Sequence, residues 1–286
     1  MQPQNNQTAV YTSLFILAAG VSSIVTFIPR HESGLLFLAY FSAFVGYFWS
    51  CRFPPHAHRM LAIGIFLRLL AFVQLPSLSD DFFRFIWDGH LINNGLSPFA
   101  ELPRVYSEQG EYPPGLSKEL FLELNSPDYF TIYPPLNQGV FWLAAKFGDT
   151  NWLLSANIIR SFLLIADIGT FFLLRKLLLA IHKNPNLANW YFLNPLVILE
   201  GVGNLHFEIF VIFFLTSGLL YWHRQKTLIS GLSMGLAIAS KLLPLIYLPA
   251  LAFNGWWKKG FIVCVISCSV ALLSFVPMLD QFLITS

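Results

Sequence analysis

Charged residues are scarce in this chain of 286 residues, because Asp, Glu, Lys and Arg make up only 11% of it. Soluble domains contain about 25% charged residues. Hydrophobic residues make up 56% of the chain, so its composition argues against a water-soluble fold. The formal net charge of +2 is too small to indicate a nucleic-acid partner. The few basic residues lie between apolar segments, where a membrane explains them better than a polyanion does.

Cysteine is also rare, and its spacing excludes a metal site of the usual kind. The three cysteines are Cys51, Cys264 and Cys268, and the last two lie four positions apart in an apolar segment. We expect inert thiols that face lipid or the protein core. No Lys or Arg precedes Arg30, and the first apolar segment has no clear cleavage site. We therefore expect a retained helix there rather than a removed signal peptide.

Long apolar segments are abundant, and several reach the roughly 20 residues that cross a bilayer. The sequence predicts an all-α fold: a multi-pass integral membrane helical bundle with about 8–9 transmembrane helices. No internal repeat and no separate soluble domain is evident, so one transmembrane domain is expected over residues 1–286. The pair 228–240 and 242–253 is short and is interrupted by Lys241 and Pro244, so a full helix followed by a re-entrant piece is an alternative. The candidate crossings are 10–28, 34–51, 59–75, 152–174, 187–200, 207–222, 228–240, 242–253 and 260–277.

The distribution of charge predicts the topology. If the N-terminus is inside, nine of the seventeen Lys and Arg residues lie in cytoplasmic loops, as the positive-inside rule requires. Segment 76–150 then lies on the other side, with ten of the fifteen acidic residues and only four basic ones. A complete crossing by the apolar segment 138–147 would invert every later loop. The sequence therefore predicts an inner-membrane protein with one large extracytoplasmic loop over about 76–150.

The predicted loop is too long for a passive connector. The prolines of 112–114 and 133–136 indicate rigid extended corners, and residues 117–124 have the apolar spacing of a helix. We expect short amphipathic helices here, lying on the outer membrane surface.

The start of this loop carries three carboxylates and one arginine within nine residues. In a helix, Asp81, Arg84 and Asp88 would lie at i, i+3 and i+7, and Asp80 and Arg84 at i and i+4. Ionisable groups beside hydrocarbon are costly, so such a cluster indicates a functional site. Arg84 could neutralise one or two of the acids and leave another to accept a proton. The alternative is a solvated helix start, with Asp80 as its cap and Arg84 in a surface ion pair. The neighbouring aromatic residues are expected to pack at the membrane interface.

A second group of polar residues is predicted on the same outer side. Asn204, His206 and Glu208 lie where one helix breaks and the next begins, and Lys241 ends helix 228–240. Polar backbone at membrane depth is tolerated only where it lines protein or a wet cavity. The alternatives are an ordinary polar loop and a Lys241 side chain that reaches the lipid headgroups.

Two charged residues lie inside predicted helix 152–174. Arg160 and Asp167 are two turns apart, so both can face the interior of the bundle. We expect Asp167 to make a structural contact between helices, and we expect the same of Arg68 in helix 59–75.

These groups match the needs of a sugar transferase. Transfer from a lipid-linked phosphosugar needs an amphipathic cleft, a cation for the leaving phosphate and a carboxylate that takes the proton of the acceptor hydroxyl. It needs no strong general acid, because phosphate leaves as an anion, whereas glycoside hydrolysis needs a carboxylic acid that protonates the leaving oxygen. No nucleophile elbow and no zinc motif is present in the sequence.

Five motifs in order resemble the GT-C glycosyltransferases, in particular bacterial polyprenyl-phosphate-mannose-dependent mannosyltransferases of a family 87-like type. Together they cover roughly residues 60–250, and their order is more specific than any one of them. They are Asp80-Asp81-x-x-Arg84-Phe85-x-Trp87-Asp88-Gly89, Gly95-Leu96-Ser97-Pro98-Phe99, Tyr133-Pro134-Pro135-Leu136-Asn137-Gln138, Asn194-Pro195-Leu196 with Gly203-Asn204-Leu205-His206-Phe207-Glu208, and Ser240-Lys241-Leu242-Leu243-Pro244-Leu245.

The resemblance implies a membrane enzyme whose catalytic aspartate lies in the first large extracytoplasmic loop. Related transferases have an Asp-x-x-Arg-Tyr pattern, which places that aspartate on Asp81, with Phe85 in place of the tyrosine and Asp80 as a helper. The donor phosphate would be met by His206 and Lys241. Some GT-C enzymes use a divalent metal ion and others do not; Asp80, Asp81, Asp88 and Glu208 could supply oxygen ligands. The substrate-binding residues expected from the resemblance are Arg84, Asp88, Tyr133, Asn204, His206, Glu208, Lys241 and Arg160.

The sequence thus predicts a glycosyltransferase that moves a hexose, with mannose the expected sugar, from a polyprenyl-phosphate donor to a hydroxyl of a glycan or glycolipid acceptor outside the inner membrane. One alternative is a transporter or flippase of lipid-linked sugar, although such carriers are usually built on inverted repeats. The other is a non-catalytic, shortened homologue, because members of the group continue for several helices beyond the position of Ser286. The transferase hypothesis requires Asp81, His206 and Lys241 to meet around one sugar phosphate.

Overall fold

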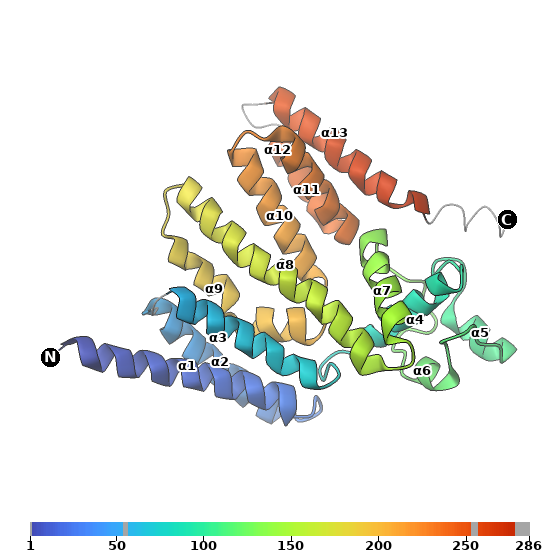
Figure 1. Ribbon diagram of the computed structural model, residues 1–286, viewed down its shortest axis with the longest axis horizontal. Helices are drawn as coiled ribbons and strands as arrows, with labels where there is room; N and C mark the ends of the chain where they lie inside the picture. The colour runs from blue at the N-terminus through green and yellow to red at the C-terminus, as the bar shows by residue number, and fades with distance from the viewer. Residues whose placement is uncertain (1, 54–56, 253–256, 278–286) are drawn as a thin grey trace. The chain divides into compact units, whose positions relative to one another are not determined.

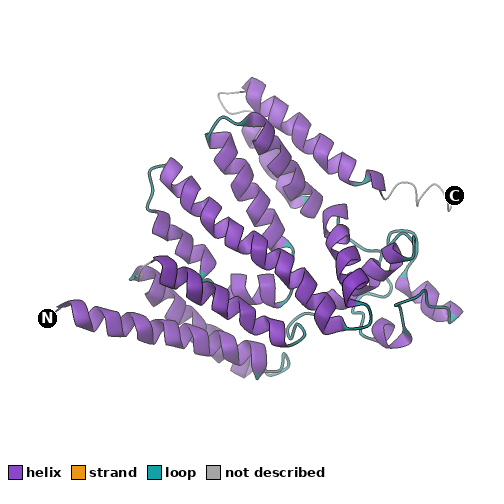
Figure 2. Ribbon diagram, in the orientation of Figure 1, coloured by secondary structure: helices purple, strands orange, loops and turns teal. Residues whose placement is uncertain are grey.

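The structure, a computed structural model, describes residues 2–53, 57–252 and 257–277. Every regular element within these ranges is helical and none is a strand (Figure 2), so the predicted all-α class is confirmed. The chain divides into two compact units, one made of Met1–Leu78 and Leu163–Ile209, the other of Ser79–Phe162 and Phe210–Ser286. A single transmembrane domain over 1–286 stays a prediction.

The first unit begins with two long apolar helices that lie side by side (Figure 1): α1, Gln2–Thr26, and α2, Ser33–Arg52. Small residues allow their close approach. A Cβ atom added to Gly46 would lie 2.5 Å from the backbone nitrogen of Leu17 and from the carbonyl oxygen of Ser13. The hydroxyls of Ser13 and Ser50 are 2.8 Å apart in the same contact, where one donates to the other away from water.

A buried ion pair joins two further helices of this unit. Helix α3, Ala57–Leu69, carries Arg68, and helix α8, Trp152–Ala180, carries Asp167. The Arg68 Nε donates to Asp167 Oδ2, and both side chains are fully buried. The structural roles expected for Arg68 and Asp167 are therefore confirmed.

The candidate crossing over 187–200 is divided into short helices. The structure has a 3₁₀-helix η2 over Pro185–Ala188, a short helix α9 over Asn189–Phe192, and a π-helix η3 over Val197–Gly203. Pro195 explains the break after α9, because it lacks an N–H and disfavours the helical conformation of the residue before it. Helix α10, Glu208–His223, follows the π-helix.

The second unit contains the segment 76–150 almost completely, and this segment forms four helices (Figure 1). The 117–124 spacing correctly predicted α6, and residues 138–147 lie within a helix of only 14 residues. Ten consecutive residues of the first helix, from Phe82 to Leu91, are buried. Its aromatic side chains therefore pack within the protein. The expectation that they pack at the membrane interface is wrong. The four helices are α4, Asp81–Asn93; α5, Pro103–Gln109; α6, Lys118–Leu122; and α7, Pro135–Gly148.

The second unit also contains the start of α8, most of α10 and a group of C-terminal helices. The C-terminal helices are α11, Thr227–Ser240; η4, Leu243–Tyr247; α12, Leu248–Ala252; and α13, Trp257–Ser274. Helix α11 ends at Lys241, as predicted, where the backbone becomes extended. Ser267 of α13 donates to the carbonyl oxygen of Gly231 at 3.1 Å, so α11 and α13 are in close contact. Lys259 donates to Gln225 at 2.9 Å, which brings together two of the loops predicted to be cytoplasmic.

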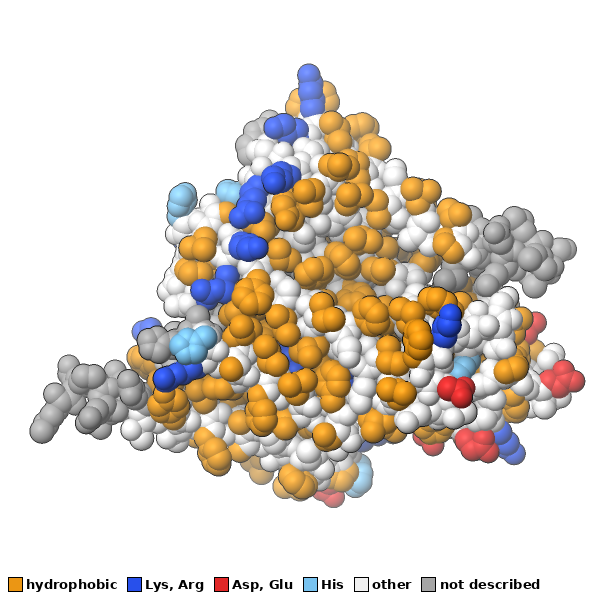
Figure 3. All heavy atoms as spheres, in the orientation of Figure 1, with side chains coloured by type: hydrophobic (Ala, Val, Ile, Leu, Met, Phe, Trp, Pro, Cys, Tyr) orange, Lys and Arg blue, Asp and Glu red, His pale blue; other side chains and the backbone are white. Residues whose placement is uncertain are grey.

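Three helices of the described chain have the length and composition to cross a membrane: Thr8–Thr26, Ser33–Arg52 and Trp257–Ser274. Val197–Gly203 and Glu208–His223 together would make a fourth, broken span. The higher number of about 8–9 crossings stays a prediction. In Figure 3, hydrophobic side chains cover much of the visible face, and the acidic side chains gather mainly over the region of α5 and α6, within the predicted outer loop.

Candidate active site

Helix α4 begins at the predicted acidic corner. Asp81 is its first residue and donates its backbone N–H to Ser79 Oγ at 3.3 Å, where a carboxylate also suits the positive end of the helix dipole. Asp80 is at the N-cap position, but its side chain makes no capping hydrogen bond. The alternative in which Asp80 caps a solvated helix start is therefore wrong.

The Asp81 carboxylate is held by two neutral donors. Asn125 Nδ2 donates to Asp81 Oδ1 at 2.6 Å, and the Tyr133 hydroxyl donates to Asp81 Oδ2 at 3.4 Å. Burial raises the pKa of the Tyr133 hydroxyl, and the nearby Asp81 carboxylate raises it further. Tyr133 therefore stays protonated and remains a donor at neutral pH. Asp81 itself is half-buried, so one side of it remains open to solvent.

The arginine of the same helix neutralises a different acid. Arg84 Nε donates to Asp88 Oδ1 at 2.7 Å, one helical turn further on. The Arg84 side chain is 3% exposed and that of Asp88 is 0% exposed, which rules out the alternative of a surface ion pair. Burial raises the pKa of the Asp88 carboxyl, while Arg84 and hydrogen bonds from neighbouring side chains oppose that rise. No salt bridge to Asp81 occurs within the described ranges, as expected if Arg84 leaves one acid to accept a proton.

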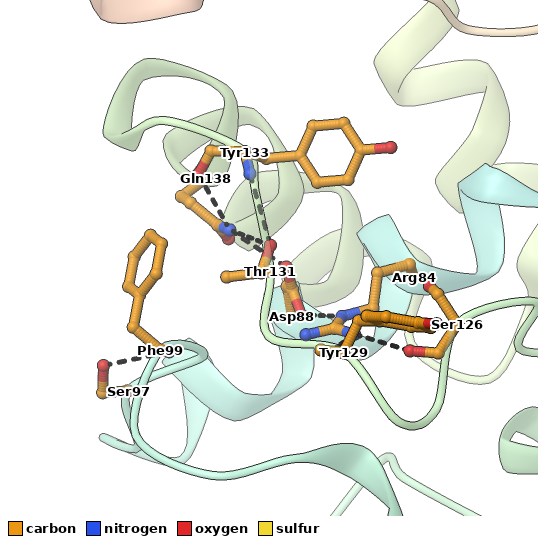
Figure 4. A network of polar contacts seen from close by, with 9 residues as sticks. All are labelled: Arg84, Asp88, Ser97, Phe99, Ser126, Tyr129, Thr131, Tyr133 and Gln138. Carbon is orange, nitrogen blue, oxygen red and sulfur yellow. Dashed lines mark hydrogen bonds and ion pairs between the residues drawn. The ribbon is translucent and has the colours of Figure 1, made fainter.

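The chain between α6 and α7 wraps around this pair (Figure 4). Arg84 Nη1 donates to the carbonyl oxygens of Ser126 and Tyr129, at 3.2 and 2.8 Å. Gln138 Nε2 of α7 lies 3.0 Å from Asp88 Oδ2, and also reaches Thr131 Oγ1. The sequence reasoning missed Asn125, Thr131 and Gln138 as site residues. Of these three, only Gln138 could have been found from the sequence, since it ends the motif that begins at Tyr133.

A cavity of about 460 Å³ opens beside the same segment. Its walls are mainly apolar, and Lys241 supplies an ammonium group. Tyr133 belongs to both places, because it lines the cavity and donates to Asp81. The lining residues are Phe99, Thr131, Ile132, Tyr133, Pro134, Lys241, Leu242, Leu243 and Phe275.

The other predicted polar group lies in the first unit and centres on Glu200, which the sequence reasoning did not select. His206 Nδ1 lies 3.4 Å from Glu200 Oε2, and Asn204 Nδ2 donates to the same oxygen at 3.2 Å. Tyr40 donates to Glu200 Oε1 at 3.1 Å. Between Asn204 and His206, Leu205 has a φ of 64°, a strained conformation for a side chain of this kind. π-Helices such as the one that carries Glu200 frequently occur at functional sites.

Arg160 and Glu208 are the remaining predicted substrate-binding residues. Arg160 is buried in α8 and donates through Nη1 to Asn157 Oδ1 at 2.9 Å. Glu208 is exposed at the start of α10. Within the described chain, no three His, Cys, Asp or Glu side chains lie together so that they could hold a metal ion, and the four proposed oxygen ligands do not form such a group.

The structure thus brings five of the predicted residues into one neighbourhood of the second unit: Asp81, Arg84, Asp88, Tyr133 and Lys241. It brings Asn204 and His206 together in the first unit through Glu200. The predicted meeting of Asp81 with His206 joins residues of different units and stays a prediction.

Residues 6–256, most of the chain, match a protein family described as alpha-(1->6)-mannopyranosyltransferase, N-terminal domain. No curated protein and no solved structure matches the chain.

Proposed function

The chain belongs to the alpha-(1->6)-mannopyranosyltransferase family, and we propose that it transfers mannose from a polyprenyl-phosphate donor to an acceptor hydroxyl, with Asp81 as the general base. The family supports a glycosyltransferase acting on a sugar donor and an acceptor. We further propose that the carrier is a polyprenyl phosphate, that the site faces the extracytoplasmic side and that Asp81 is the base.

One observation carries the proposal: the Asp81 carboxylate accepts from neutral donors and has no salt bridge within the described ranges, while Arg84 is bound to Asp88. In the reaction, the proton of the acceptor hydroxyl moves to the Asp81 carboxylate. The acceptor oxygen forms a bond to the anomeric carbon, and the bond between that carbon and the phosphate oxygen breaks with inversion. The phosphate keeps the electron pair and leaves as an anion, so no carboxylic acid needs to protonate it.

The cavity beside Tyr133 fits the donor chemically. Its apolar walls suit the first prenyl units, and the ammonium group of Lys241 suits the leaving phosphate. Tyr133 joins the cavity to Asp81, so a sugar attached to a phosphate near Lys241 would extend toward the base. His206, Asn204 and Glu200 offer a second polar group for the donor or the acceptor.

The site is proposed on the extracytoplasmic side of the inner membrane. Ten of the fifteen acidic residues lie in segment 76–150, whereas the loops at 224–226 and 258–259 are basic and contact each other. This charge asymmetry supports the orientation by the positive-inside rule.

The test is a transfer assay on the purified protein in liposomes, supplied with polyprenyl-phosphate-linked radiolabelled mannose and a mannose-terminated glycolipid. We expect label on the glycolipid, in proportion to protein and time. Movement of the donor across the bilayer without transfer would instead support a flippase. Binding of the donor with neither activity would support a non-catalytic homologue, and either result contradicts the proposal.

In the same assay, Lys241→Met is expected to lower kcat/KM for the donor about tenfold or more. A hydrogen bond to a charged group is worth about 1.5–3 kcal/mol, and about 1.4 kcal/mol corresponds to a tenfold change. Lys241→Arg should restore most of kcat/KM because it keeps the positive charge. The control is Lys118→Met, which removes a lysine at the start of α6 that does not line the cavity. An unchanged kcat/KM in Lys241→Met would remove Lys241 from the site of the donor phosphate.

A further inference from the structure

We propose that Arg84, Asp88 and Gln138 are positioning residues that hold segment 125–133 so that Asn125 and Tyr133 orient the Asp81 base. The inference rests on the proposed role of Asp81. It gives the buried Arg84 and Asp88 a role other than substrate binding, and it adds Gln138, which was not among the predicted site residues. We call these three residues the clamp.

The clamp holds the first part of the segment through arginine. Arg84 donates through Nη1 to the carbonyl oxygens of Ser126 and Tyr129, while its Nε is bound to Asp88. Asn125 precedes Ser126 directly and donates to Asp81. A planar guanidinium can serve a carboxylate and two carbonyl groups in fixed directions, which a lysine ammonium cannot do. The position of Asn125 is therefore set by a contact that depends on arginine geometry.

The clamp holds the second part through the amide of Gln138. Its Nε2 lies 3.0 Å from Asp88 Oδ2, 3.2 Å from Thr131 Oγ1 and 3.3 Å from the carbonyl oxygen of Tyr133 (Figure 4). The last contact fixes the backbone of the residue whose hydroxyl donates to Asp81. Stacking between the rings of Phe85 and Phe141, and their edge contacts with the Tyr133 ring, support the same placement.

Asp88 links Arg84 to Gln138, because one of its carboxylate oxygens accepts from Arg84 and the other accepts from Gln138. All three clamp side chains are 3% exposed or less, so a substrate does not reach them in this conformation. Electrostatic interactions are stronger in such a water-poor environment, and they keep the segment in one arrangement. The same segment forms one wall of the cavity, through Thr131 and Tyr133. The clamp therefore places the base and the donor cavity in a fixed relation.

The test uses Gln138→Met and Arg84→Lys, each alone and combined with Asp81→Asn. Methionine keeps the length of glutamine but donates no hydrogen bond, and lysine keeps the charge of arginine but not its planar geometry. The control is Arg224→Lys, which changes an exposed arginine of the same unit that lies outside segment 125–133. The readouts are kcat and KM for transfer, and amide hydrogen exchange over residues 126–133.

We expect each clamp variant to lower kcat about 10–100-fold with a small change in KM, since a misplacement of about 1 Å can cost about 100-fold. In the Asp81→Asn background the same changes should lower kcat less than about twofold, because residues that act through one group are not additive. Hydrogen exchange over 126–133 should rise in the clamp variants and stay unchanged in Arg224→Lys.

The results separate the two proposals. Normal transfer by Asp81→Asn would overturn the proposed base. A strong loss in Asp81→Asn, together with normal kcat in both clamp variants, would overturn the clamp and leave the base in place. Losses that multiply fully in the double variants would also overturn the clamp, since they would show an effect independent of Asp81. If Gln138→Met fails to fold, Arg84→Lys and the exchange measurement still decide the question.

Discussion

Replacing Asp81 by asparagine is expected to lower kcat for mannose transfer about 100-fold or more while the protein still inserts and folds. A positioned general base contributes about 10²–10⁴-fold to a rate, and an amide cannot take the acceptor proton. The amide oxygen of asparagine can still accept one hydrogen bond, from Asn125 or Tyr133, so the local structure should persist. KM for the donor should change little, because the substitution removes an interaction that matters mainly in the transition state. Initial rates with radiolabelled lipid-linked mannose measure both constants.

The control for this prediction is Glu111→Gln. Glu111 is an exposed carboxylate of the same unit, and it lies outside segment 125–133 and does not line the cavity. Near-normal turnover is expected for Glu111→Gln. Turnover by Asp81→Asn equal to that of the control would exclude Asp81 as the base.

The sequence could predict that Arg84 pairs with one acid of segment 80–88 and leaves another without a salt bridge, because this depends on local spacing. A helical spacing of 3.6 residues places Arg84 within reach of more than one carboxylate of segment 80–88, and this limited the choice to a few pairs. The choice of Asp88 depends on burial, which the spacing does not contain. Segment 125–133 covers the arginine and supplies two carbonyl oxygens to it. Local periodicity cannot foresee a contact between residues more than forty positions apart.

The difference between local spacing and tertiary contact also explains why the sequence did not predict two site residues, and why the candidate crossing over 187–200 is divided. Asn125 and Gln138 enter the site only through tertiary contacts with Asp81 and Asp88. Over 187–200 the apolar composition suggested a crossing, but Pro195 and the π-helix that follows divide the segment. The long apolar helices α1, α2 and α13 were predicted well, because a run of apolar residues of that length specifies a helix without help from its neighbours.

Removing Arg68 is expected to have the largest effect on stability. Arg68→Met leaves the fully buried Asp167 carboxylate without its ion pair in the first unit. Breaking a buried pair by removal of one partner costs about 3–5 kcal/mol. Arg68 also donates to the Gly64 carbonyl oxygen at 2.8 Å and lies 4.1 Å from the centre of the Phe192 ring, so further contacts are lost with it. The free energy of unfolding in mixed detergent micelles measures the loss.

The double variant Arg68→Met with Asp167→Leu should recover most of that stability, because apolar side chains of similar volume often replace a buried pair at little cost. Arg59→Met is the control for arginine removal from the same helix, since Arg59 is exposed, and it should change the free energy of unfolding much less. A loss in the double variant as large as the sum of the two single losses would show that Arg68 and Asp167 contribute separately. Recovery in the double variant would instead identify the cost of Arg68→Met as that of an unpaired buried charge. The stability of the first unit would then require the pair to be either complete or absent, and would not require the charges themselves.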